Sequence, residues 1–235
     1  KKIKTMQFLA KNSIIFILIS GLYSCTKEPT KTPVSVYCKI INEKLYSFSR
    51  LSDFEKVKFD ELKKSRFLKY KNDFIEAAQT FDIEWELLAA VAFQESQWDP
   101  KARSATQVKG MMMLTLPTAA SVGVTNRLDP IQSIYGGAQY IADLKLSTNY
   151  GTSSGDKIAF ILASYNLGTT NVRNAIDAIN KKSIELTWLD LEGYLLNLKT
   201  SMDSENYSRG QQTVDFVERV RDYYYLLLAQ NCRES

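Results

Sequence analysis

Hydrophobic residues recur at intervals of three and four positions along most of the chain, which is the pattern of amphipathic helices. No stretch alternates hydrophobic and polar residues convincingly with a period of two, so we expect no substantial sheet and an all-α fold. Polar loops are expected over residues 97–109 and 201–210. The pattern predicts helices over residues 52–64, 70–81, 82–96, 117–123, 130–147, 158–168, 170–181, 187–198 and 211–230.

Several of these helices begin with residues that cap a helix N-terminus. Ser52 and Glu55 have the spacing of a capping box. Asp129 precedes a proline that can occupy the first helical position. Asp82 is the expected N-cap of the helix that follows it, and Thr187 that of a later helix.

The central helix is almost entirely apolar and ends on a carboxylate, Glu95. At about 100° per residue, Glu95 points close to the direction of Leu88 and Val91, which must face a core. A carboxyl at the edge of a core is partly desolvated, which raises its pKa and suits it to act as a general acid. The alternative is a side chain in a fraying last turn that points to water, and the helix alone does not decide between them.

Composition and charge exclude several kinds of function. The chain has 235 residues, of which 45% are apolar and 24% charged, which suits one good-sized globular domain. Four of the 30 basic residues precede residue 12, which leaves 26 basic against 26 acidic residues and no basic surface for nucleic acid. The absence of His excludes Ser-His-Asp and Cys-His catalysis, and with it most zinc sites. We expect no metal and no organic cofactor.

The first 25 residues are typical of an export signal. A basic start precedes the apolar run Ile14–Ile19, which is too short to span a bilayer of about 30 Å. The sequence Leu22–Cys25 resembles a bacterial lipobox, in which the cysteine is lipidated. Plain cleavage and an uncleaved anchor are the alternatives. We therefore predict a lipoprotein signal over residues 1–25, a polar tether over 26–50 and one folded domain over 51–235.

The two remaining cysteines leave a question open. In an oxidising compartment Cys38 and Cys232 could form a disulfide. Two unrelated thiols are equally compatible with the sequence.

Three segments with candidate chemistry follow one another in a recognisable order. They are Ala92–Ser96, Gly110–Ala119 and Ala163–Gly168, with Ser104 between the first two. Together they resemble the "ES", "GLMQ…P.TA" and "AYN" motifs of soluble-lytic-transglycosylase catalytic domains. The likeness covers about residues 70–228, and the triple Met resembles the membrane-bound lytic murein transglycosylase F branch. It implies a goose-lysozyme-like helical fold that cleaves peptidoglycan between N-acetylmuramic acid and N-acetylglucosamine.

The resemblance also assigns roles to individual residues. Glu95 matches the single catalytic acid/base of the family, and Ser104 matches a serine that faces this carboxylate. Tyr165 and Asn166 match a pair beside the scissile bond, although the two could simply end a buried helix. Ser104 could likewise cap a turn.

The matching substrate groove includes Gly110, Met111 and Met113, but at least one methionine of the triplet is expected in the core. Met113 stands where the wider family has Gln, which puts a polar contact to the sugar in doubt. Phe216 corresponds to an aromatic residue on the last helix. The F branch usually carries a solute-binding-like domain ahead of the catalytic one, and we expect it to be absent here.

The expected substrate is therefore a peptidoglycan glycan strand, with the membrane contacted through the lipid. The expected location is the cell envelope, in the outer membrane facing the periplasm. Two alternatives stay open: a hydrolytic muramidase, which needs a second carboxylate such as Asp99 or Asp129, and a peptidoglycan-binding lipoprotein without catalysis.

Overall fold

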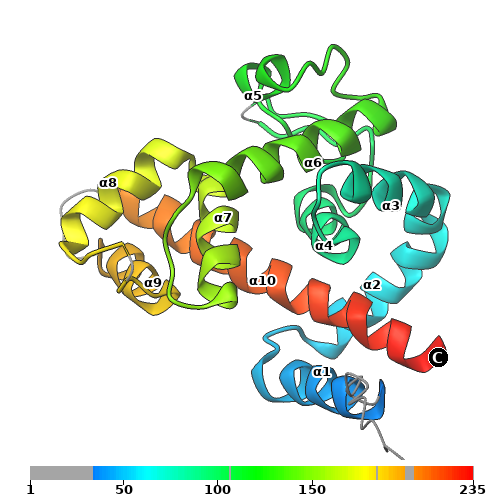
Figure 1. Ribbon diagram of the computed structural model, residues 1–235. Helices are drawn as coiled ribbons and strands as arrows, with labels where there is room; N and C mark the ends of the chain where they lie inside the picture. Colours follow the sequence, from blue (N-terminus) through cyan, green and yellow to red (C-terminus); the bar gives the residue numbers. More distant parts are fainter. Residues whose placement is uncertain (1–33, 106, 184, 199–203, 235) are drawn as a thin grey trace, which may run out of the picture. The chain divides into compact units, whose positions relative to one another are not determined.

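The computed structural model describes residues 34–105, 107–183, 185–198 and 204–234, and these form helices joined by loops (Figure 1). No strand occurs within these ranges; the loop after α4 contains two isolated bridges, Arg103 with Lys109 and Lys109 with Leu114. The all-α prediction is confirmed. The helices are α1 (Val34–Phe48), α2 (Asp53–Ser65), η1 (Phe67–Lys69), α3 (Lys71–Thr80), α4 (Trp85–Ser96), α5 (Leu116–Ser121), α6 (Pro130–Ser147), α7 (Ser154–Leu167), α8 (Thr169–Ile179), α9 (Trp188–Asn197) and α10 (Ser204–Glu234).

The long helix α10 organises the packing, because α1, α4, α7 and α9 all pack against it (Figure 1). Where α10 meets α4, the ring of Phe93 lies 4.5 Å from that of Tyr223 and 4.7 Å from that of Phe59. Trp98 joins this aromatic cluster with no exposed surface, and its indole N–H donates to the carbonyl of Ala89 at 2.9 Å. The last turn of α4 is therefore fixed on both sides by buried rings.

The predicted helix starts hold at three of the four positions. Ser52 and Thr187 form capping boxes, and the side chain of Asp129 accepts from the N–H of Gln132. The assignment of Asp82 as an N-cap is wrong. Asp82 has φ +51° and follows the end of α3, where the next N–H, that of Ile83, reaches back to the carbonyl of Ala78. This is the geometry of a helix C-terminus, and the N-cap of α4 is Glu84.

The structure differs from the sequence prediction at both ends of the described region. Residues 34–48, expected in a polar tether, form α1, whose Ile41 and Leu45 pack with Leu228 and Ala229 of α10. Cys38, Ile41 and Leu45 recur at intervals of three and four positions, so the sequence carries a helical pattern that the prediction of a tether did not take into account. α10 begins at Ser204, so most of the predicted loop 201–210 is helical.

The question about the cysteines is answered by a disulfide between Cys38 of α1 and Cys232 of α10, with a Cα–Cα distance of 5.6 Å. The predicted signal, Cys25 and the start of the tether lie outside the described residues. Among the residues that are described, no helix combines the length and the apolar character that crossing a membrane requires.

Candidate active site

The predicted catalytic residues meet at a cavity of about 220 Å³ between the end of α4, the loop before α5, and helices α6 and α7. Glu95, Met113, Tyr165 and Asn166, which were predicted as site residues, all line it. The cavity is lined by Glu95, Val108, Met113, Leu114, Thr115, Thr118, Tyr140, Tyr165 and Asn166. Residues separated by 70 positions in the sequence thus share one small space.

Glu95 is held at this cavity by the way α4 ends. Gln97 and Trp98 both have positive φ, 54° and 58°, which turns the chain sharply away from the helix axis. Ser96 fixes the turn, because its hydroxyl donates to the carbonyl of Ala92 at 3.1 Å and to that of Met111 at 2.8 Å. The position of the Glu95 carboxyl therefore follows from backbone geometry and from a buried tryptophan.

The environment of Glu95 favours its protonated form. Burial raises the pKa of the Glu95 carboxyl to about 8. Within the described parts of the chain, no hydrogen bond or ion pair to the carboxyl offsets this desolvation. At neutral pH Glu95 is an acid that carries a proton, as the sequence led us to expect of a general acid.

Tyr165 lies beside Glu95 and has a fixed orientation. Its hydroxyl donates to the carbonyl of Met112 at 2.7 Å. Its ring lies 5.2 Å from that of Tyr140 and is stacked on that of Phe216 at 6.3 Å. Burial, with smaller contributions from Glu95 and Tyr140, raises the pKa of Tyr165 well above its usual value. The phenol therefore stays protonated and can serve the site as a hydrogen-bonding group.

Asn166 is oriented by the last helix. Its side-chain oxygen accepts from the hydroxyl of Thr213 at 3.0 Å, and the same hydroxyl donates to the carbonyl of Arg209 at 2.9 Å. Since the amide oxygen is used in this way, the NH₂ group is the part of Asn166 that remains to donate to a ligand.

The segment Gly110–Met113 contributes to the core at some positions and to the cavity at another. A Cβ on Gly110, at φ +84°, would lie 1.7 Å from the carbonyl oxygen of Arg127, so only glycine fits. Met111 has no exposed surface and belongs to the core, so the predicted contact between Met111 and the sugar is not supported by its position. Gly110 is also buried, outside the cavity lining. Met113, at φ +46°, does line the cavity.

Ser104 lies in the loop after α4, where its N–H donates to the carbonyl of Val108 at 3.1 Å. Val108 lines the cavity, whereas Ser104 is not among the described residues that line it. A direct role of the Ser104 hydroxyl toward Glu95 stays a prediction.

Sequence reasoning assigned no individual role to Tyr140, Thr115 or Thr118, although the two threonines lie in the segment Gly110–Ala119. The two threonines share a hydrogen bond of 2.8 Å between their hydroxyls, and Thr115 also caps α5. Tyr140 is partly buried on α6, and burial raises the pKa of its phenol. An aromatic residue with a polar end at the edge of the apolar stripe of α6 was the available signal.

The carboxylates considered for a hydrolase, Asp99 and Asp129, have other roles in the structure. Asp99 accepts from the N–H of Lys101 at 2.9 Å, and Asp129 caps α6 by accepting from the N–H of Gln132 at 2.8 Å. Neither lines the cavity, where Glu95 is the one carboxylate among the described residues. In the same ranges, no group of three or more Asp, Glu, Cys or His side chains could hold a metal ion.

Comparisons with known proteins agree with this arrangement. Residues 72–187 match the family model described as "Transglycosylase SLT domain". The membrane-bound lytic murein transglycosylase F of Shewanella loihica is 39% identical over 194 residues, which is 80% of this chain and 40% of the relative. The protein of that name from Maricaulis maris is 40% identical over 192 residues, 78% of this chain and 42% of the relative. The chain thus spans less than half the length of these relatives.

A solved structure supports the fold assignment. An inactive mutant of the lytic transglycosylase Slt from Pseudomonas aeruginosa aligns with a TM-score of 0.50 at 18% identity, covering 66% of this chain and 23% of that protein. At this level of identity the alignment speaks for the helical fold alone. The family match, the curated relatives and the arrangement of the motifs agree, and the chain belongs to the transglycosylase SLT family.

Proposed function

We propose that this chain is a peptidoglycan lytic transglycosylase, which cleaves the β-1,4 bond between N-acetylmuramic acid and N-acetylglucosamine and leaves a 1,6-anhydro end. The observation that carries the proposal is a single protonated carboxyl, Glu95, in a cavity with no second carboxylate among its described lining residues. Glycosidases that hydrolyse this kind of bond ordinarily use two carboxyl groups.

In the first step Glu95 acts as a general acid. A carboxyl with a pKa of about 8 holds its proton at neutral pH and can deliver it to the glycosidic oxygen as the bond breaks. The positive charge that develops at the anomeric carbon is stabilised by the 2-acetamido group of the substrate, as in substrate-assisted glycosidases. The enzyme then needs no nucleophile of its own.

In the second step the same residue acts as a base. Ionised Glu95 accepts the proton of the 6-hydroxyl group of the muramic acid, and that oxygen bonds to the anomeric carbon. The product is an anhydro sugar, no water is consumed, and Glu95 regains its proton. Closure within one sugar ring is helped by effective concentration when the geometry is right.

Tyr165 and Asn166 are proposed to orient the substrate. The Tyr165 phenol lies near Glu95 and donates its proton to the carbonyl of Met112, so its oxygen can accept a hydrogen bond from the N–H of the acetamido group, or from the leaving hydroxyl once Glu95 has protonated it. The NH₂ group of Asn166 can donate to a sugar hydroxyl or carbonyl. Met113 offers an apolar surface to the sugar ring at the position where the wider family has Gln.

The test is digestion of purified peptidoglycan followed by mass analysis of the products, with the Glu95→Gln variant as the blank. We expect muropeptides that are lighter by one water than those with reducing ends. Reducing ends would show a hydrolase instead, and binding without turnover would show a binding protein.

We also infer that the chain is held in the cell envelope by lipid on Cys25, in the outer membrane facing the periplasm. The support is the signal-like segment before Cys25, together with the name "membrane-bound" carried by the relatives. Metabolic labelling with a radioactive fatty acid should mark the wild-type chain and fail to mark Cys25→Ser. Equal labelling of both chains would refute lipidation at this residue.

A further inference from the structure

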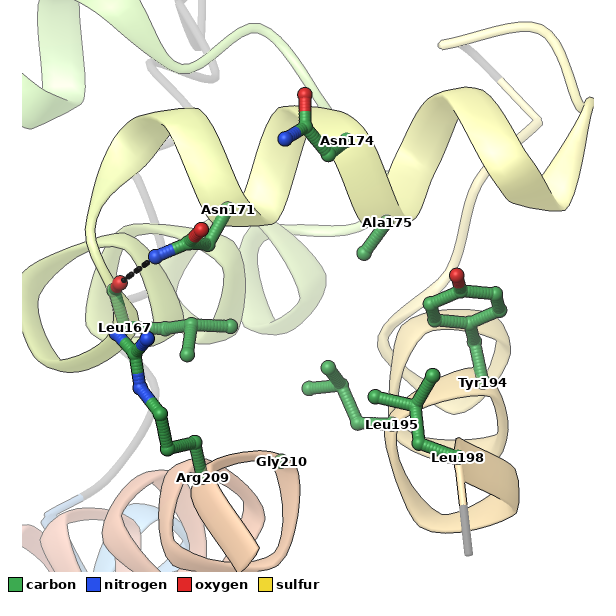
Figure 2. A pocket seen from close by; sticks show the side chains of 9 residues that line it. All are labelled: Leu167, Asn171, Asn174, Ala175, Tyr194, Leu195, Leu198, Arg209 and Gly210. Carbon is green, nitrogen blue, oxygen red and sulfur yellow. Dashed lines mark hydrogen bonds between the residues drawn. The ribbon is translucent and has the colours of Figure 1, made fainter. Parts of the chain in front are cut away.

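A second cavity, of about 180 Å³, adjoins the candidate active site. Asn166 lines the first cavity and Leu167 lines the second, so the C-terminal end of α7 forms the wall between them. Figure 2 shows side chains from α7, α8, α9 and α10 that surround this space. It is lined by Leu167, Asn171, Asn174, Ala175, Tyr194, Leu195, Leu198, Arg209 and Gly210.

The chemistry of the second cavity differs from that of the first. It contains a cation, Arg209, whose side chain extends from α10 toward Leu167 (Figure 2). Tyr194, Asn171 and Asn174 add a phenol and two amides. One amide is used within the protein, because Asn171 donates to the carbonyl of Leu167 at 2.8 Å. A cavity with a guanidinium on one side and amide and phenol groups on its other sides suits a carboxylate and the peptide bonds next to it.

The side chain of Arg209 is exposed and is not used in a described ion pair. Its backbone, in contrast, is firmly placed. A Cβ on the next residue, Gly210, would lie 2.7 Å from the carbonyl oxygen of Leu195, so α9 and α10 approach closely there. The carbonyl of Arg209 accepts from Thr213, which also holds Asn166. One set of contacts therefore positions both the active-site amide and this cation.

We propose that the second cavity binds the acidic peptide carried by the glycan strand, with Arg209 pairing with a peptide carboxylate. This inference rests on the proposed function. In peptidoglycan each peptide is attached to the muramic acid whose glycosidic bond is cleaved. The peptide therefore has to extend out of the first cavity near the bound sugar. No Lys or Arg is among the described residues lining the first cavity, whereas the second cavity supplies one.

The experiment compares two substrates: glycan strands with their peptides, and the same strands after an amidase has removed them. We measure kcat/KM on each for the wild type, Arg209→Ala and Arg173→Ala. Arg173 is an exposed arginine of the same region, on α8, that does not line the cavity. In Arg209→Ala the ratio of the rate on peptide-bearing strands to that on bare strands should fall about tenfold, the effect of one charge-assisted hydrogen bond. Arg173→Ala should leave the ratio unchanged.

An unchanged ratio in Arg209→Ala would overturn the inference. So would an equal loss on both substrates, because bare strands lack the peptide and carry only the lactyl carboxylate that the amidase frees. A second measurement does not depend on catalysis: the peptide released by the amidase is titrated into wild-type protein and into Arg209→Ala by calorimetry. Weaker binding to the variant supports the inference even if the wild type proves to cleave no glycan, and equal binding contradicts it.

Discussion

Two buried regions of the molecule surround a carboxyl group with opposite electrostatic environments. In the active-site cavity, Glu95 has no described ion-pair partner, and its pKa rises to about 8. On α10, Glu218 and Asp222 are 6% and 1% exposed, yet they lie among arginines. Glu218 pairs with Arg50 at 2.6 Å, and both carboxylates pair with Arg221, at 3.2 and 3.0 Å.

The comparison shows that burial alone does not decide what a carboxylate does. Where arginines lie beside it, the carboxylate contributes to holding α10 and the segment between α1 and α2 together: Asp222 also accepts the N–H of Arg50 at 2.7 Å. At Glu95 no cation among the described residues pairs with the carboxyl, which therefore carries a proton and can donate it. Replacing each glutamate by its neutral isostere, glutamine, separates these two roles.

The largest expected effect is on turnover. In Glu95→Gln the only proposed proton donor is lost, so kcat should fall by about a thousandfold or more, within the usual range for general acid–base catalysis. Digestion rates of purified peptidoglycan measure this. The matched change Glu218→Gln, in the ion-paired region, should keep most of the turnover per folded molecule. If both variants lost activity equally, the proposed contrast would be wrong.

The second effect is on stability and has opposite signs in the two regions. The folded-state pKa of Glu95, about 8, lies above its ordinary value of 4.5. The native state therefore keeps a proton that the unfolded chain releases, and the wild type loses stability as pH rises through this window, up to about 3 kcal/mol at pH 7. Because Gln does not titrate, Glu95→Gln should be the more stable protein above pH 5, by a margin that stops growing above pH 8.

Urea unfolding between pH 4 and pH 9 measures this margin. Glu218→Gln should instead lower the free energy of unfolding at neutral pH, by about 2 kcal/mol, because two arginines lose a buried partner while staying partly exposed to solvent. A Glu95→Gln variant with the same stability as the wild type at every pH would contradict the assignment of a protonated Glu95.

The smallest effect concerns the phenol next to the acid. Tyr165→Phe removes the hydrogen bond to the carbonyl of Met112 and the proposed contact to substrate, so kcat should fall about tenfold and stability by about 1 kcal/mol. Tyr150→Phe is the control, since Tyr150 packs against Phe160 at 5.7 Å and does not line the cavity. A Tyr165→Phe variant with full activity would remove the phenol from the mechanism.

The sequence was most informative in two ways. Helix periodicity predicted most of the helix bounds and directed Glu95 toward a core, whereas the resemblance to the transglycosylase motifs placed Tyr165 and Asn166 in the same site. All three residues line one cavity. Outside helices, periodicity fails as a guide. Which of Met111 and Met113 reaches the cavity depends on positive φ angles and on contacts with distant residues, which no periodicity encodes.

Two further misses have different causes. Asp82 is a residue type that often caps a helix N-terminus, but here it lies in a left-handed conformation, where Lys145 of α6 contacts both its carbonyl and its carboxylate. This miss has its cause in a contact between distant segments. α1 is stabilised by a small apolar contact with α10 and by a disulfide, but its apolar positions already recur at helical spacing, so the sequence itself could have predicted it.

The disulfide between Cys38 and Cys232 has a consequence for the covalent topology of the chain. It joins residues 194 positions apart and closes the intervening polypeptide, which includes the whole candidate active site, into a ring. A protease that cut one peptide bond in any loop of this ring would release no fragment. The two pieces would stay attached through sulfur, and a nicked molecule would separate only under reducing conditions.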